Sequence, residues 1–108
     1  MCPVDFSKSS RGALRYAATI AAHVGGRLTL LAVNDPLVGE AAELTGGQAR
    51  LVDDTVREMK KFFGQSLGAG ATAFGEVQFE VASGKPAAEI LRVSRERGCD
   101  LIVMASHG

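Results

Sequence analysis

Short apolar runs alternate with longer stretches of helical periodicity along the chain. Residues 28–33 and 101–105 are almost continuously apolar, without the alternation of a strand that has one face in water. Such runs are typical of strands buried on both faces of a parallel sheet. In 10–24 and 48–67, apolar residues recur every three or four positions, as in helices that bury one face. Together the two patterns predict an α/β fold built on a parallel sheet.

Weaker signals complete the order of elements. Residues 2–6 form a short apolar stretch followed by serines, which favour a helix start because a serine oxygen can accept from a free amide of the first turn. Residues 76–82 alternate apolar and polar side chains, which is typical of an edge strand. Pro86 suits the first turn of a helix that we expect to end at Gly98. The predicted order is therefore β-α-β-α-β-α-β.

This order predicts a three-layer α/β sandwich, with residues 1–108 forming a single domain and with right-handed crossovers. Residues 37–47 carry three glycines and two acidic residues without a sustained period, so we expect a surface loop over the carboxyl edge of the sheet. Ligands of such sheets bind outside the carboxyl ends of the strands, where the strand order reverses. A site is therefore expected near Ser106, His107 and Gly108, which follow the last predicted strand.

Composition narrows the classes of function. Twelve basic residues balance twelve acidic ones, which gives no electrostatic reason to expect nucleic acid or an anionic membrane as a partner. The sequence has no apolar run of membrane-spanning length and no signal-peptide pattern, so we expect a cytoplasmic protein. Cys2 and Cys99 lack the close spacing of metal ligands. We interpret them as small buried hydrophobic residues and expect no metal site.

Four segments carry a resemblance to a known family. They are 3–7 (PVDFS), 28–33 (LTLLAV), 83–91 (SGKPAAEIL) and 98–108 (GCDLIVMASHG). These segments, in this order, are similar to those of the universal stress proteins, and the resemblance extends over nearly the whole chain.

The resemblance implies a Rossmann-like sheet of the adenine nucleotide alpha hydrolase type, with strand order 3-2-1-4-5, of which this chain would hold 3-2-1-4. It also implies a site for ATP or another adenine nucleotide between the first and fourth strands. Family members that bind ATP hold adenine and ribose at the ends of strands one and two, and the phosphates with a glycine loop after strand four. The matching positions here are Pro3, Asp5, Val33, Met104 and, as the first glycine of that loop, Gly108.

The sequence departs from the family pattern in two places. Ala105 stands where glycine is usual before Ser-His-Gly, and the rest of the glycine pattern, with the fifth strand and its helix, is missing after Gly108. We therefore expect the 108 residues to be part of a longer polypeptide, with a first strand clipped at its beginning and a further C-terminal β-α unit. Because fifth strands pair in the family's usual dimer, we expect a homodimer of the intact protein.

The expected function is that of a regulatory or stress-response module, not an enzyme, that binds an adenine nucleotide. One alternative is a dimerisation or protein-interaction module of the same family that binds no nucleotide. Another is a nucleotide-using α/β enzyme, which would need a glycine-rich phosphate motif that residues 5–10 lack. His107 has no partner at a triad-like spacing, and Lys85 stands outside any P-loop frame. A flavodoxin-like receiver would need an acidic cluster where only Asp5 stands.

Overall fold

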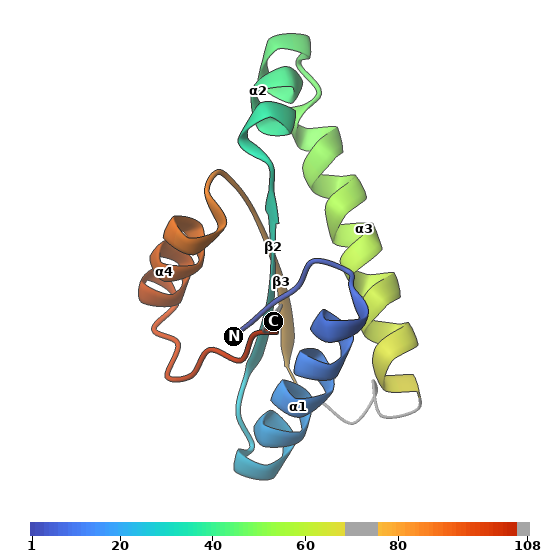
Figure 1. The fold of residues 1–108 in the computed structure, drawn as a ribbon, viewed down its shortest axis with the longest axis vertical. Helices are drawn as coiled ribbons and strands as arrows, with labels where there is room; N and C mark the ends of the chain where they lie inside the picture. The colour runs from blue at the N-terminus through green and yellow to red at the C-terminus, as the bar shows by residue number, and fades with distance from the viewer. Residues whose placement is uncertain (69–75, 106–108) are drawn as a thin grey trace.

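The computed structural model describes residues 1–68 and 76–105, which contain three strands and four helices (Figure 1). In chain order the elements are β1 (Cys2–Pro3), α1 (Lys8–Val24), β2 (Leu28–Asn34), α2 (Pro36–Thr45), α3 (Gln48–Leu67), β3 (Val77–Ser83) and α4 (Pro86–Glu96). The alternation of strands and helices confirms the predicted α/β class. The bounds of α3 agree with the stretch predicted from the apolar period.

The sheet is parallel, with β2 between β1 and β3. β2 and β3 pair along their whole length, from Leu28 opposite Val77 to Asn34 opposite Ser83. β1 pairs with β2 only through its two residues. The position of β3 at one edge confirms the edge strand expected from its alternating pattern. The central position of β2 explains its continuous apolar run, because both of its faces are covered.

Helices cover both faces of the sheet, which gives the three layers of the predicted sandwich (Figure 1). On the face covered by α1 and α3, which we call the α1/α3 face, the core includes the fully buried Leu14, Leu30 and Met59. On the opposite face, which we call the α4 face, a smaller cluster includes Leu31 and Val93. Successive residues of β2 thus enter different clusters, as the alternation of side chains along a strand requires.

Side chains hold the turn from β1 into α1. Ser7 is the N-cap residue, and its Oγ accepts from the backbone N–H of Ser10 at 3.1 Å, in agreement with the cap predicted from the serines. The Oγ of Ser10 accepts in turn from the backbone N–H of Asp5, also at 3.1 Å. β1 is shorter than the predicted strand 2–6, and by Phe6 the backbone has left the extended conformation, with a φ of 67°.

The loop predicted over 37–47 is wrong, because this stretch forms most of α2. Asp35 caps the helix by accepting a backbone N–H at 2.8 Å, and Pro36 occupies the first turn, where its missing N–H breaks no helical bond. The helix packs through Gly39 against Ser83, and a Cβ on Gly39 would lie 3.0 Å from the Cβ of Ser83. Gly39 is the only buried residue of α2, so no apolar stripe marks the helix in the sequence.

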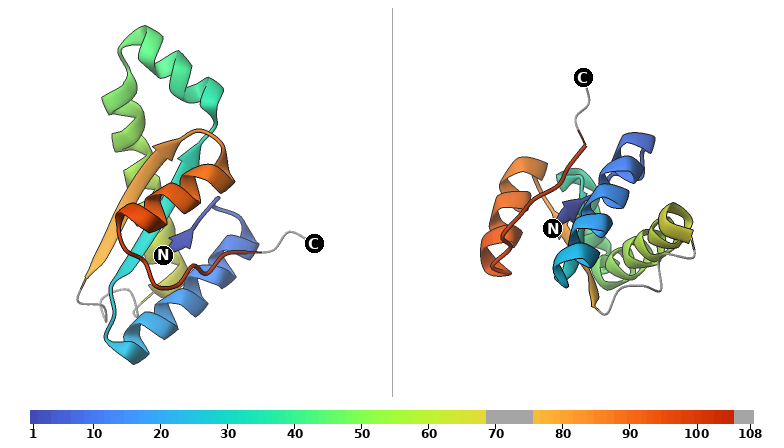
Figure 2. Two further views of the ribbon diagram at one scale, coloured as in Figure 1. Left: turned by 90° about the vertical axis from the view of Figure 1, so that its left-hand side faces the viewer. Right: turned by 90° about the horizontal axis from the view of Figure 1, so that it is seen from below.

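The segment 101–105 lies outside the three-stranded sheet, so the fourth strand predicted there is not confirmed. It runs beside the start of β1 (Figure 2). Two backbone hydrogen bonds join this segment to Met1. The N of Met1 donates to the carbonyl of Leu101 at 2.7 Å, and the N of Val103 donates to the carbonyl of Met1 at 2.9 Å. Because β1 is so short, it offers this segment few backbone groups with which to pair.

The side chains of this segment still alternate between the two faces. Ile102 packs against the α4-face cluster, and Val103 packs against the α1/α3-face core. Leu101 and Met104, however, are 50% and 56% exposed. The predicted burial of the whole segment on both faces is therefore wrong.

Candidate functional site

Three of the residues predicted to bind a nucleotide share one face at the carboxyl edge of the sheet. Pro3 pairs with Leu31, which belongs to the α4-face cluster, and partners in a parallel ladder point to the same side. Val33 lies two residues beyond Leu31 and packs against the same cluster. Met104 lies two residues beyond Ile102, which also packs there, and the alternation along the chain places it on that side. Pro3 and Val33, and by this alternation Met104, therefore lie on the α4 face near the carboxyl edge.

Asp5 lies just past the end of β1, before the first turn of α1. Its Oδ1 accepts from the backbone N–H of Ser7 at 3.0 Å, and its own N–H donates to the buried Oγ of Ser10. The carboxylate is thereby held at the N-terminus of α1, where the helix dipole favours a negative charge and where the first turn has no acidic residue of its own. Asp5 therefore has a structural role that requires no ligand.

Sequence reasoning missed two side chains at this edge. Phe6 adopts a positive φ that residues other than glycine seldom populate, and its ring meets Phe62 edge-on with 5.5 Å between centroids. Asn34 ends β2, and its Nδ2 donates to the Oγ1 of Thr55 on α3 at 3.3 Å. Asn34 could have been found, since it is the first polar side chain after an apolar strand. No pattern in the sequence predicts the backbone conformation of Phe6.

The predicted phosphate loop lies outside the described residues. Gly108 and its neighbours Ser106 and His107 belong to that part of the chain. The structure therefore places four of the five residues predicted to bind a nucleotide, and it places them at one edge of the sheet.

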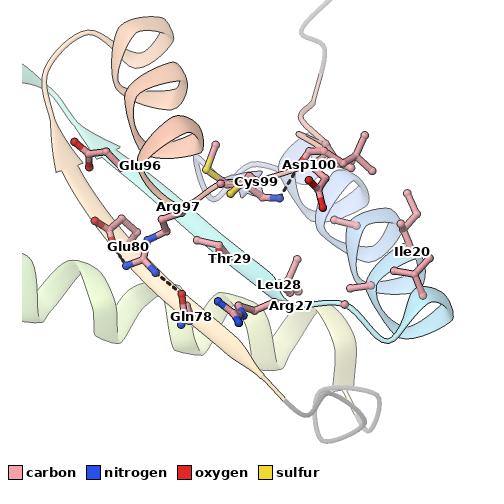
Figure 3. Close-up of a pocket in the computed structure, with 18 residues that line it drawn as sticks. Ile20, Arg27, Leu28, Thr29, Gln78, Glu80, Glu96, Arg97, Cys99 and Asp100 are labelled. Atoms are coloured by element: carbon pink, nitrogen blue, oxygen red, sulfur yellow. Dashed lines mark hydrogen bonds and ion pairs between the residues drawn. The ribbon is translucent and has the colours of Figure 1, made fainter.

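A cavity of about 830 Å³ lies at the opposite, amino edge of the sheet (Figure 3). The starts of β2 and β3, the C-terminal half of α1 and the chain after α4 surround it. On its polar side, the guanidinium of Arg97 binds the carboxylate of Glu80 and the side-chain oxygen of Gln78. Pro3, Asp5, Val33 and Met104 do not line this cavity. The cavity and the predicted nucleotide site are therefore at different ends of the strands.

The two cysteines are free thiols. Cys2 is fully buried, as predicted, and burial raises the pKa of its thiol to about 11. Cys99 is half-buried. Within 1–68 and 76–105, no group of three or more His, Cys, Asp and Glu side chains could hold a metal ion. Nor does any helix in those two ranges have the length and apolar character needed to cross a membrane.

Comparison with known proteins agrees with the order of elements seen here. Universal stress protein UspA from Lactobacillus plantarum is 25% identical, with a TM-score of 0.68, over 99% of this chain and 77% of that one. The hypothetical protein MJ0577 is 24% identical, with a TM-score of 0.72, over 99% and 73% of the two chains. A universal stress protein in complex with cAMP is 19% identical, with a TM-score of 0.62, over 93% and 65%. The last two show a likeness of fold.

The family model described as the universal stress protein family matches residues 1–108. The match spans β1, β2, β3 and the segment beside β1, which together carry the carboxyl edge described above. On this evidence the chain belongs to the universal stress protein family.

Proposed function

We propose that this chain is a regulatory or stress-response module, not an enzyme, that binds ATP or another adenine nucleotide at the carboxyl edge of its sheet. The observation that supports the proposal most directly is that Pro3, Val33 and Met104 lie on the α4 face near the end of β1, which Asp5 follows. An apolar surface with a few polar groups at strand ends suits a planar base with a sugar attached.

The roles of the individual residues follow from their chemistry. Pro3, Val33 and Met104 supply apolar contact to the base. The backbone groups at the strand ends form hydrogen bonds with the edge of the base. Asp5 accepts from ribose hydroxyls. A carboxylate has about four acceptor sites, and the N–H of Ser7 occupies one of them at 3.0 Å. The cAMP complex of a relative with the same fold supports adenine nucleotides as the class of ligand.

In this proposal the backbone that follows Met104 binds the phosphates, with Gly108 as the first glycine of the loop. Successive backbone N–H groups can form a concave site for an anion. Ala105 adds a methyl group where the family usually has glycine, so the phosphate end is where this chain differs most from the members that bind ATP. A titration should therefore compare ATP with AMP and cAMP.

The wider architecture belongs to the same proposal. Segment 101–105 is the fourth strand, in the order 3-2-1-4. Its two backbone bonds with Met1 support this, because they have the pattern of a parallel ladder. The homodimer and the cytoplasmic location implied by the resemblance belong to the same proposal.

Isothermal titration with ATP, AMP and cAMP tests the function. Asp5→Asn keeps an oxygen that can accept from the N–H of Ser7 but removes the charge. Hydrogen bonds to charged groups contribute about 1.5–3 kcal/mol, so this substitution should weaken binding by roughly 10-fold to 100-fold. Asp54→Asn is the matched control, because Asp54 is exposed on α3. It should leave the affinity unchanged.

Three results would contradict the proposal. Absence of heat with all three nucleotides at millimolar concentration would favour a family member that binds protein partners only. Equal losses in Asp5→Asn and Asp54→Asn would remove Asp5 from the site. Turnover of ATP by the wild-type chain, abolished in Asp5→Asn, would support the enzyme alternative.

A further inference from the structure

The last residues of β2 are bonded to the sheet on one side only. Alternate residues of a parallel strand direct their backbone groups to opposite neighbours. Asn34 faces β3, since its carbonyl accepts from the N–H of Gly84 at 3.1 Å. Leu31 faces β1, since its carbonyl accepts from the N–H of Val4 at 2.8 Å, and within the described residues it is the last residue of β2 to make such a bond. The N–H and the carbonyl of Val33 therefore face the side where β1 has ended.

A side-chain bond to α3 holds the residue after Val33. The Nδ2 of Asn34 donates to the Oγ1 of Thr55 at 3.3 Å, and this hydroxyl donates its only proton to the carbonyl of Leu51 at 2.8 Å. The hydroxyl can therefore only accept from Asn34, so the amide nitrogen and not the amide oxygen faces it. Thr55 is 6% exposed, which protects the bond from competition by water. Asn34 is thus fixed by its carbonyl at β3 and by its side chain at α3.

We propose that Thr55 is a positioning residue for the base, which acts through Asn34 to fix the backbone of Val33 at the nucleotide site. This inference rests on the proposed function and names the base that the site selects. The carbonyl of Val33 is an acceptor that suits the 6-amino group of adenine. The same carbonyl would face the 6-oxo oxygen of hypoxanthine, which has no proton to donate. The site should therefore prefer ATP to inosine triphosphate, and this preference should depend on Thr55.

Such a preference requires a carbonyl that cannot turn away. A site that bonds a donor rejects an analogue without that donor because its own polar group is left unpaired. If the end of β2 could tilt, the carbonyl of Val33 would turn to water when hypoxanthine binds, and the penalty would be lost. The bond from Asn34 to Thr55 opposes this movement from the α1/α3 face. The apolar side chains proposed to contact the base lie on the α4 face, so Thr55 acts without touching the nucleotide.

Thr55→Val tests the inference, with Thr55→Ser and Thr19→Val as controls. Valine keeps the shape of threonine but lacks the hydroxyl, whereas serine keeps the hydroxyl. Thr19 is exposed on α1, and its Oγ1 also donates to the carbonyl four residues earlier, at 2.9 Å, so Thr19→Val removes the same helical bond outside the proposed site. In isothermal titration, Thr55→Val should lower the ratio of ATP affinity to inosine triphosphate affinity by about tenfold. Thr55→Ser and Thr19→Val should keep the wild-type ratio.

Hydrogen exchange in the chain without nucleotide gives an independent measurement. The Gly84 amide, which donates to the carbonyl of Asn34, should exchange about tenfold faster in Thr55→Val than in wild type or Thr19→Val. An unchanged rate would overturn the inference whether or not the chain binds a nucleotide.

The two titrations separate this inference from the proposed function. If wild type binds ATP and Thr55→Val keeps the wild-type affinity ratio, the inference is overturned and the proposed function stands. An equal loss in Thr55→Ser or Thr19→Val would also overturn it, because the effect would then be one of general stability. If wild type binds neither nucleotide and Gly84 still exchanges faster in Thr55→Val, the proposed function fails with its base preference, while the role of Thr55 in holding the end of β2 is supported.

Discussion

Replacement of Ser10 by alanine perturbs the turn from β1 into α1, which positions Asp5 in the proposed site. Ser10 is 1% exposed, and its Oγ accepts from the backbone N–H of Asp5 at 3.1 Å. Its own backbone N–H still donates to the Ser7 cap in the variant. The substitution therefore removes one hydrogen bond and leaves the helix cap in place. Ser9→Ala is the matched control, because Ser9 is an exposed neighbour in the same helical turn.

The expected loss follows from two opposing effects. Leaving a part-buried N–H without its partner costs about 1–3 kcal/mol, whereas alanine in place of serine gains up to about 0.5 kcal/mol of helix propensity. The first effect is larger, so Ser10→Ala should unfold with about 1–2 kcal/mol less free energy than wild type. Ser9→Ala should be neutral or slightly stabilised. For a chain of this size the difference corresponds to roughly 5–15 °C in Tm.

Thermal and urea unfolding, each with and without ATP, measure this prediction. Because Ser10 positions Asp5, the variant should also gain less stability from saturating ATP than Ser9→Ala gains. If the two variants melted at the same temperature, the hydrogen bond between Asp5 and Ser10 would not stabilise the fold. The physical account of this turn would then be refuted.

Two further predictions concern packing and burial. Gly64→Ala should stabilise by roughly 0.5–1 kcal/mol, because a Cβ there meets nothing within 4 Å. Gly39→Ala should have a free energy of unfolding about 1–3 kcal/mol lower than that of Gly64→Ala, because its Cβ would lie 3.0 Å from the Cβ of Ser83. Equal free energies for the two variants in urea unfolding would show that α2 does not pack as described. The pKa of Cys2 is raised from 9.0 to about 11 in the folded chain, so its stabilising effect is complete below pH 9 and declines as the pH rises towards 11. The loss of unfolding free energy between pH 9 and pH 11 should reach about 3 kcal/mol at most. If Cys2→Ala lost the same stability over this pH range, ionisation of the Cys2 thiol would not be the cause.

The parts of the fold predicted from the sequence are those whose burial imposes a regular period. α3 packs a continuous stripe that includes Met59 and Phe62, and its bounds were predicted correctly. β2 is covered on both faces and so reads as a continuous apolar run. α2 was missed because Gly39 is its only buried residue, while Leu37 and Leu44 stay 74% and 89% exposed. Such a helix leaves no apolar stripe to find.

The site was predictable only where the sheet determines it. Alternation along the strands suffices to bring Pro3, Val33 and Met104 to one face, once the order of the strands is known. The bond from Asn34 to Thr55 and the backbone conformation of Phe6 depend on how α3 and α1 pack, which no local pattern records. The cavity at the amino edge depends on the register of β1, and a register cannot be read from a strand of two residues.

Mapping of backbone amide shifts during an ATP titration tests the central claim most directly, because it separates the two edges of the sheet. The account predicts that the amides of Asp5, Val33 and Met104 shift with a single saturation curve, while those of Thr29 and Arg97 stay in place. Shifts gathered at Thr29 and Arg97 would move the nucleotide to the amino-edge cavity and would contradict the site proposed at the carboxyl edge.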